Sequence, residues 1–340
     1  MFIKEVVKEL KEVFETTNEY QVSINHVFKN NGVELDGVVI CKKDQKIAPN
    51  IYLNTYYDMY REGMSISNII SNIIEIYYNA LDNRFVSTFE LDFSFESIKD
   101  SIVYKVVNYE NNIEMLKNIP YIKFLDLAII FQCSVESSMD GLASVRITNE
   151  HIKSWGITTE MIYMIAKKNT PRLFPLVLKN MEDVLSELMG SKKIGRISDC
   201  INGEHKDVFM EDDGCYFNNK GNKNLKNKCV SDELDDMLDR VDLNRSFDMY
   251  VLSNIYGING ASAILYKGVL SKFADRLMKD LYIIPSSVHE VIVIPKRKEW
   301  GVGMLKEMVY DVNINQVPIE DVLANSVYEF SRENSELKVL

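Results

Sequence analysis

The residues best suited to catalysis stand together in one short segment, Ser286-Ser287-Val288-His289-Glu290. A serine becomes a nucleophile when a histidine takes its proton, and a third group can orient that histidine. The spacing argues against such a site. On an extended strand, residues 287 and 289 share a face about 6–7 Å apart, too far for the direct hydrogen bond that a base needs. The nucleophile-elbow pattern G-x-S-x-G is also absent.

The same segment has a structural interpretation, since it separates two β-prone runs, LYII and VIVIP. In this interpretation Pro285 ends the first strand, the two serines satisfy backbone groups of the turn, and His289 begins the second strand. We favour it. The alternative is an enzyme whose site is assembled from distant residues such as His151, His289 and Glu290. A deep polar cleft around His289 would favour the enzyme, and a packed His289 would favour the structural interpretation.

A second group of residues has the chemistry of a metal site: Cys200, His205, Cys215 and Cys229 lie in one loop-rich stretch. Zinc binds such ligands and could organise the stretch. The spacing lacks the local CxxC or HxxxH pair that is typical of structural zinc sites. The phosphate-binding pattern GxxxxGK[ST] is absent as well. We therefore predict no cofactor and keep zinc as the alternative.

Composition indicates a folded, soluble protein. The chain has 340 residues, 46% of them hydrophobic, which suits two domains better than one. It contains no apolar run of about 18 residues, and its N-terminus is an amphipathic helix instead of a signal peptide. The five cysteines are an odd number, which indicates reduced thiols. We expect a cytoplasmic protein that binds no membrane.

The formal net charge of −11 weighs against direct binding of nucleic acid, because binding phosphates needs clustered lysine and arginine. We expect a protein partner instead. The sequence leaves the identity of that partner and the oligomeric state open.

The N-terminal part predicts strands around a hairpin turn at Asn30-Asn31-Gly32, since an Asn-Gly step supplies the positive φ of a tight turn. His26 falls on the apolar face of the first strand, which predicts a core residue. A helix over residues 65 to 80, capped by Ser65, carries the longest apolar face in the chain.

Farther along, residues 124 to 148 predict a hairpin, and Asn149 and Thr158 cap two following helices. Pro171 is expected to end the second of these helices. Residues 249 to 266 predict another hairpin, with Asn259-Gly260 at its turn. Helices are expected over residues 267 to 278 and around residues 305 to 312.

Residues 190 to 246 are rich in Gly, Asn, Lys and Asp and poor in large aliphatic residues. They predict a loop-rich, charged insertion with one short helix over residues 232 to 241, and its deletion should be tolerated. The order of elements predicts an α+β fold with mostly antiparallel sheets and packed helices. We place one lobe at residues 1 to 120 and the other at 121 to 340.

Four segments resemble a family of uncharacterised proteins from clostridia and related gut Firmicutes: PNIYLNTYYDMYREG, HIKSWGITTEMIYMIAKKNTPRLFP, MYVLSNIYGINGASAILYKGVLSKFADRLMKDLYIIPSSVHEVIVIP and NQVPIEDVLANSVYEF. The C-terminal half is also similar to the YtpQ-type family of Firmicutes. The resemblance covers most of the chain outside residues 190 to 246. It implies no chemistry for any numbered residue.

Two hypotheses about function follow. In the first, the protein is a non-enzymatic macromolecule-binding or regulatory protein. A narrower version is a mobile-element counter-defence protein that acts on a nucleic-acid-binding enzyme through its acidic surface. In the alternative, the protein is a hydrolase-like enzyme with a site around Ser287, His289 and Glu290.

Overall fold

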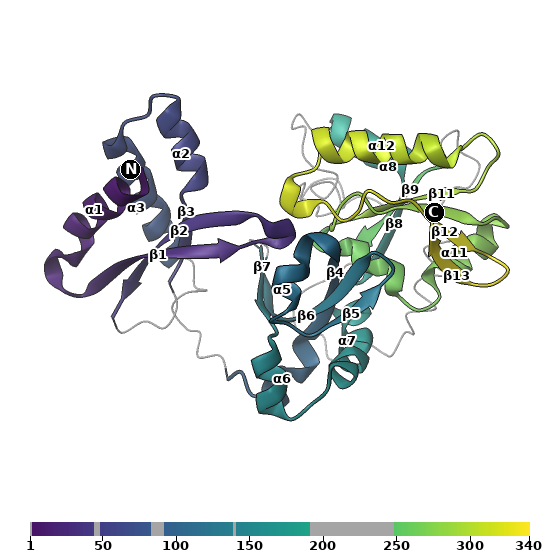
Figure 1. Cartoon of the computed structure of the whole chain (residues 1–340), viewed down its shortest axis with the longest axis horizontal. Coiled ribbons are helices and arrows are strands. Elements are labelled where there is room, and N and C mark those ends of the chain that lie inside the picture. Colours follow the sequence, from purple (N-terminus) through teal and green to yellow (C-terminus); the bar gives the residue numbers. More distant parts are fainter. Residues whose placement is uncertain (1, 44–47, 83–91, 139–140, 191–247) are drawn as a thin grey trace. The chain divides into compact units, whose positions relative to one another are not determined.

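The computed structural model describes residues 2–43, 48–82, 92–138, 141–190 and 248–340 (Figure 1). The chain divides into two compact units, Met1–Phe93 and Ser94–Leu340. The strands of the described residues form three sheets in which every pairing is antiparallel, so the predicted α+β class is confirmed. Except for residue 190, the predicted insertion lies outside the described residues. The helix expected at 232 to 241 lies outside them as well.

The described residues of unit 1 form one sheet of order β1-β2-β3 and three α-helices. Its elements are α1 (Phe2–Phe14), η1 (Glu15–Thr17), β1 (Tyr20–Phe28), η2 (Asn30–Gly32), β2 (Glu34–Lys42), β3 (Asn50–Tyr52), α2 (Asn54–Arg61) and α3 (Ile66–Asp82). The predicted hairpin and the predicted helix at 65 to 80 are therefore confirmed. The Ser65 hydroxyl accepts the backbone N–H of Asn68, as a helix cap does.

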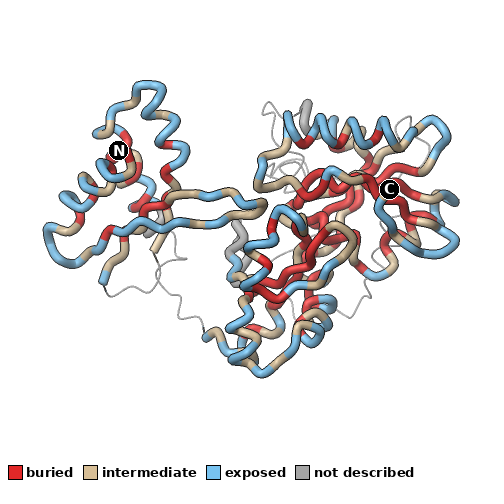
Figure 2. The backbone as a smooth tube through the Cα atoms, in the orientation of Figure 1, coloured by how far each residue is buried: buried red, intermediate tan, exposed pale blue. Residues whose placement is uncertain are grey.

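The core of unit 1 lies between the helices and one face of the sheet. The helices α1 and α3 contribute the buried residues Val6, Leu10, Ile69, Ile73 and Tyr77, and the sheet contributes Val22, Val38, Ile40 and Ile51. Figure 2 shows this buried band along the elements of the unit, with exposed residues on their outer surfaces. Burial of these apolar side chains holds the unit together.

The prediction that His26 is a core residue is wrong. The imidazole is 72% exposed and lies against the carboxylate of Asp36 on β2. The helices cover only one end of the β1–β2 hairpin, so Val22 is buried while the side chains farther along β1 face solvent. An alternating pattern predicts which residues share a face, but not how far a helix covers it.

Unit 2 contains the other two sheets. Its helices are α4 (Phe95–Ile98), α5 (Ile113–Leu116), α6 (Asn149–Trp155), α7 (Thr159–Leu173), α8 (Met181–Gly190), α11 (Val269–Leu277) and α12 (Val302–Asn315). Its 3-10 helices are η3 (Lys99–Ser101), η4 (Glu110–Asn112), η5 (Gly260–Leu265) and η6 (Ile319–Asp321). Each described helix in the chain is too short or too polar to cross a membrane.

The four-stranded sheet of unit 2 is built on its long central strand. It consists of β4 (Ile102–Asn108), β5 (Tyr121–Phe124), β6 (Leu127–Ser138) and β7 (Gly141–Arg146), and β6 pairs with the other three. Because β4 pairs with β6 along its whole length, residues 94 to 120 belong to unit 2. The boundary between the units thus follows Phe93, whereas the boundary predicted from the sequence is at residue 120.

The six-stranded sheet has the order β13-β12-β10-β11-β9-β8. Its strands are β8 (Leu176–Asn180), β9 (Tyr250–Asn254), β10 (Leu281–Ile284), β11 (Val291–Pro295), β12 (Tyr328–Ser331) and β13 (Glu336–Val339). The helix α12 packs on one face through Leu305 and Val309. On the other face the ring of Phe273, from α11, meets the ring of Tyr250 at 4.9 Å. The helix predicted at 267 to 278 is α11, and it packs on this sheet.

The hairpin predicted at Asn259-Gly260 is absent. Asn259 does adopt a positive φ of 54°, but η5 follows it in place of a strand. A Cβ atom at Gly260 would lie 2.0 Å from the Ser253 hydroxyl and 2.4 Å from the His289 carbonyl, so the close approach requires glycine. The apolar residues after it are buried by tertiary packing in η5.

The prediction that Pro171 ends its helix is also wrong, because α7 continues to Leu173. Pro171 lies in the last turn of α7, where the helix has only two more residues to form. The predicted cap of α7, Thr158, accepts the backbone N–H of Met161, and the cap of α6 is Thr148, one residue before the predicted Asn149.

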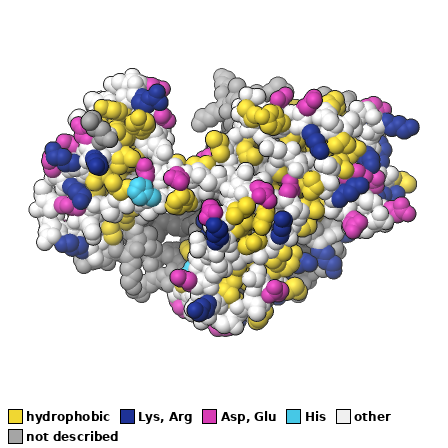
Figure 3. Space-filling view, in the orientation of Figure 1, with side chains coloured by type: hydrophobic (Ala, Val, Ile, Leu, Met, Phe, Trp, Pro, Cys, Tyr) yellow, Lys and Arg dark blue, Asp and Glu magenta, His cyan; other side chains and the backbone are white. Residues whose placement is uncertain are grey.

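Acidic and basic side chains are interspersed over the visible faces of both units (Figure 3). Hydrophobic side chains form small patches between them.

Candidate functional site

The segment with the strongest catalytic composition connects β10 to β11. The Nδ1 atom of His289 accepts the backbone N–H of Asn259 at 3.3 Å, and Nε2 lies 3.2 Å from the carboxylate of Asp321. A neutral imidazole carries one proton, so an accepting Nδ1 places that proton on Nε2, the nitrogen that faces the Asp321 carboxylate. Both ring nitrogens are thus engaged.

Both serines of this segment accept hydrogen bonds from backbone N–H groups. The hydroxyl of Ser287 accepts the backbone N–H of His289 at 3.0 Å, and the carbonyl of Ser286 accepts the N–H of Leu323 at 3.0 Å. Both serines are buried. Glu290 is half-buried and directly precedes β11.

The geometry matches half of a catalytic triad. Asp321 orients the histidine, as the acid of a triad does. The other ring nitrogen, which would take the proton of a nucleophile, already accepts the Asn259 amide. No sequence pattern links Asp321 to His289, because Asp321 lies on η6, far from His289 along the chain.

The other histidine of the distributed-site hypothesis caps a helix. The Nδ1 atom of His151 accepts the backbone N–H of Thr148 at 3.1 Å, and the Thr148 hydroxyl accepts the N–H of His151. Its ring stacks on Trp155 with centroids 5.5 Å apart. These contacts belong to the first turns of α6.

The metal candidates Cys200, His205, Cys215 and Cys229 lie outside the described residues. Within the described ranges, no group of three or more His, Cys, Asp or Glu is arranged to hold a metal ion. Of the thiols in these ranges, Cys133 is buried, and burial raises its pKa.

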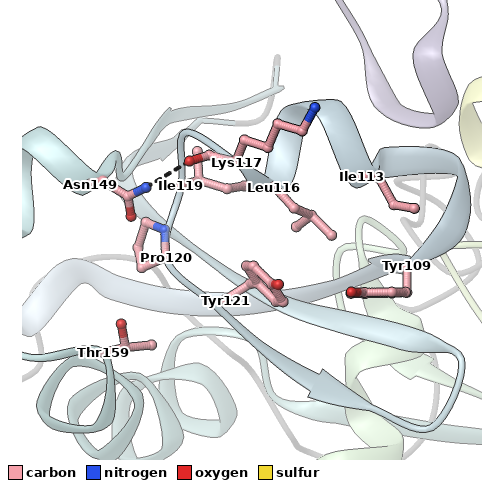
Figure 4. A pocket seen from close by; sticks show the side chains of 9 residues that line it. All are labelled: Tyr109, Ile113, Leu116, Lys117, Ile119, Pro120, Tyr121, Asn149 and Thr159. Atoms are coloured by element: carbon pink, nitrogen blue, oxygen red, sulfur yellow. Dashed lines mark hydrogen bonds between the residues drawn. The ribbon is translucent and has the colours of Figure 1, made fainter.

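An open pocket of about 380 Å³ lies in unit 2 where α5, β5 and the starts of α6 and α7 meet (Figure 4). Two tyrosines line it: Tyr109 follows β4, and Tyr121 begins β5. Figure 4 shows Leu116 of α5 pointing down toward Tyr121, and Ile113 lying on the same side above Tyr109. We refer to it as the tyrosine pocket; its remaining lining residues are Lys117, Ile119, Pro120, Asn149 and Thr159.

The floor of the tyrosine pocket is part of the core. Leu116 and Ile119 are almost fully buried and pack with Val107, Ala128 and Ile130 on one face of the four-stranded sheet. The side-chain amide of Asn149 donates to the carbonyl of Lys117 at 3.1 Å, and this bond ties α6 to the segment before β5. The walls of the pocket are therefore fixed by the packing of α5 on the sheet and by the hydrogen bond from α6.

Among the residues that line the pocket, Lys117 alone is charged. The Lys117 ammonium lies 2.6 and 2.7 Å from the two carboxylate oxygens of Glu114, which neutralises it. Lys123 lies over the Tyr109 ring, 4.0 Å from the centroid. The neighbouring Tyr109 hydroxyl raises the pKa of Tyr121, so this phenol is neutral at physiological pH.

Apolar surface is exposed at the mouth of the pocket, since Ile113 is 41% and Tyr121 is 36% exposed. Tyrosines are enriched where proteins bind one another, because each offers a broad apolar ring with a polar tip. No sequence motif marks this set, since its members come from the loop after β4, from α5 and the segment that follows it, from β5, and from the starts of α6 and α7.

A family model described as a family of unknown function (DUF5688) matches residues 1–332. No curated protein matches the chain, and no solved structure does.

Proposed function

We propose that this chain, which belongs to a family of unknown function (DUF5688), is a protein-binding protein. In this proposal an uncharged apolar side chain of a partner enters the tyrosine pocket and anchors the complex. The observation that carries it is the pocket itself, with exposed apolar surface on a rigid, nearly neutral frame.

The size of the pocket supports an anchoring role. A volume of about 380 Å³ is near the lower end of the range for ligand sites, which runs from about 300 to 1,000 Å³. It accommodates one or two side chains. A few such buried anchors supply most of the affinity in many protein complexes, and the polar residues around them exclude water. Asn149 and Thr159 provide polar groups at this rim.

The engagement of His289 supports a binding protein over the hydrolase-like alternative. A general base needs a ring nitrogen that is available to the nucleophile. In His289 one nitrogen accepts a backbone amide and the other contacts Asp321. The serine nearest to it in sequence, Ser287, accepts the amide of His289 itself.

The net charge of −11 supports a narrower version, in which the partner is basic and itself binds nucleic acid. The counter-defence role belongs to this version. A clostridial source and a likeness of the C-terminal half to the YtpQ-type family are likewise proposals.

Partner recovery with matched variants tests the proposal. The affinity-tagged full-length chain, Ile113→Glu and Ile314→Glu would each be expressed in the source cells, and copurifying proteins quantified by mass spectrometry. Ile314 lies on α12, is 61% exposed and does not line the pocket, so it is a matched control.

We expect a partner that the wild-type chain and Ile314→Glu retain and that Ile113→Glu loses at least about tenfold, as removal of a 1.4 kcal/mol anchor requires. Equal recovery by all three chains would contradict the proposed role of the pocket. Recovery of no partner by the wild-type chain would contradict the proposed function.

A further inference from the structure

The strand β3 forms an edge of the sheet in unit 1. Within the part of unit 1 that the structure describes, it pairs with β2 on one side only, in the register Val39↔Asn50, Val38↔Ile51 and Gly37↔Tyr52. The bond from the Leu53 N–H to the Asp36 carbonyl, 2.7 Å long, sets the alternation of this ladder.

Alternation determines which backbone groups of β3 remain available. In an antiparallel pair, hydrogen-bonded residues alternate with residues whose N–H and C=O point away from the partner strand. Since Leu53 is hydrogen-bonded to β2, so is Ile51, and the backbone groups of Asn50 and Tyr52 point to the open side. No described residue forms a hydrogen bond with these outward groups.

A groove of about 820 Å³ runs along this edge. Its far wall is one face of α3, formed by Asn72, Glu75, Ile76 and Asn79, which are spaced at i, i+3, i+4 and i+7. Tyr56 and Met59 of α2 also line the groove. Ile76 is 46% exposed there, although it is a large aliphatic residue.

We propose that this groove binds an extended, basic segment of a partner protein, which joins the sheet as a fourth strand beside β3. The outward N–H and C=O groups of Asn50 and Tyr52 pair with the backbone of the segment. Every second side chain of the segment points into the groove toward Ile76 and Met59. This site lies in unit 1 and does not depend on the tyrosine pocket.

The charge of the groove determines the chemistry of the segment. Glu75 is exposed and forms no ion pair with a described residue. Among the described residues that line the groove, none is a lysine or an arginine. The ammonium of Lys29 lies over the Tyr52 ring, 4.7 Å from its centroid. The carboxylate that the groove offers to a basic side chain of the segment is that of Glu75 on α3.

The same charge disfavours a second copy of this chain as the occupant. Pairing of β3 with β3 of another copy would bring two grooves together, each with its own Glu75. Like charges at such an interface are repulsive. An extended segment also needs only the short edge that three residues offer.

The test is a selection of random short peptides on the full-length chain, followed by affinity measurements with the selected peptides. We expect lysine or arginine to be enriched in them. Backbone N-methylation should weaken binding at every second peptide position and have little effect at the positions between, because only alternate N–H groups face β3. A uniform response to N-methylation would overturn the proposal, as would a failure to select any peptide.

Variants of residues that line the groove test whether the peptide binds there. Ile76→Lys should weaken binding at least about tenfold, and Glu75→Gln should weaken the binding of basic peptides a few-fold. The controls are Val13→Lys and Glu5→Gln on α1, which does not line the groove; Val13 is 49% exposed. Equal affinity for Ile76→Lys and Val13→Lys would overturn the proposal.

Two further measurements separate the alternatives. Ile113→Glu should bind the peptides normally, so failure of the tyrosine pocket and failure of this groove are distinguishable. Sedimentation should show that the wild-type chain does not form a dimer through this groove. A wild-type dimer that the substitution Ile76→Lys dissociates would assign the groove to a second copy and overturn the proposal.

Discussion

The hydroxyl of Thr170 on α7 accepts the backbone N–H of Tyr104 on β4 at 3.0 Å. Two residues along the same strand, the hydroxyl of Ser262 accepts the N–H of Val106 at 3.3 Å. The strand β4 is an edge of its sheet, yet it is almost fully buried. Side-chain hydroxyls thus satisfy the amides that a further strand would have bonded, and this closes the edge.

Removal of the Thr170 hydroxyl should destabilise the protein strongly. In Thr170→Val the shape is kept, but the buried amide of Tyr104 loses its acceptor, which costs about 1–3 kcal/mol. Thr170→Ser keeps the hydroxyl and should lose less. Urea unfolding of the three chains measures the difference, and equal stability of Thr170→Val and the wild-type chain would show that the bond contributes nothing.

His289→Gln should lower the free energy of unfolding by about 1–2 kcal/mol, because one or both of the bonds to Asn259 and Asp321 are lost. Asp321→Asn should lower it by a similar amount, and the double variant by less than the sum, since the two residues interact. Thermal and urea unfolding measure these effects, and partner binding should stay unchanged. Loss of an activity in His289→Gln at an unchanged melting temperature would instead support the enzyme.

Tyr77 should make the stability of unit 1 sensitive to alkaline pH. Its hydroxyl is buried without a hydrogen-bond partner among the described residues. Burial, helped by the nearby phenols of Tyr20 and Tyr78, raises the pKa of Tyr77 to about 12. Above about pH 10 the unfolded chain loses this proton while the folded chain keeps it, so stability falls as the pH rises.

Tyr77→Phe should therefore be at least as stable as the wild-type chain near neutral pH, and its advantage should grow by about 1–3 kcal/mol toward pH 12. Far-UV circular dichroism during urea unfolding at several pH values measures this. Tyr78→Phe, which removes an exposed hydroxyl from the same helix, is the control. A constant difference between Tyr77→Phe and the wild-type chain across this range would show that the phenol is accessible to solvent.

Gly260→Ala should be destabilising by about 1–3 kcal/mol, because its methyl group would overlap the Ser253 hydroxyl and the His289 carbonyl. Gly303→Ala is a matched control, since a Cβ at Gly303 meets nothing within 4 Å and the residue lies in α12. That substitution should stabilise the helix by about 0.5–1 kcal/mol. Thermal unfolding compares them, and equal melting temperatures would contradict the tight contact at Gly260.

Local patterns in the sequence determined those elements that depend only on residues close together along the chain. The apolar stripe from Ile66 to Tyr77 and its cap at Ser65 predict α3, and Asn31-Gly32 predicts the turn of the β1–β2 hairpin. These features depend on helical periodicity and on the φ that each turn residue allows, so a single segment suffices to identify them. The α+β class follows from the order of such segments.

Tertiary structure alone decided the features that depend on residues distant in sequence. Asn259-Gly260 has the composition of a hairpin turn, but close packing against Ser253 and His289 places a 3-10 helix after it. His26 is exposed because α1 and α3 cover only part of its strand. Asp321 reaches His289, and Tyr109 reaches Tyr121, only once the strands have paired. Such contacts arise from the burial of whole faces against one another, and no short stretch of the sequence contains that information.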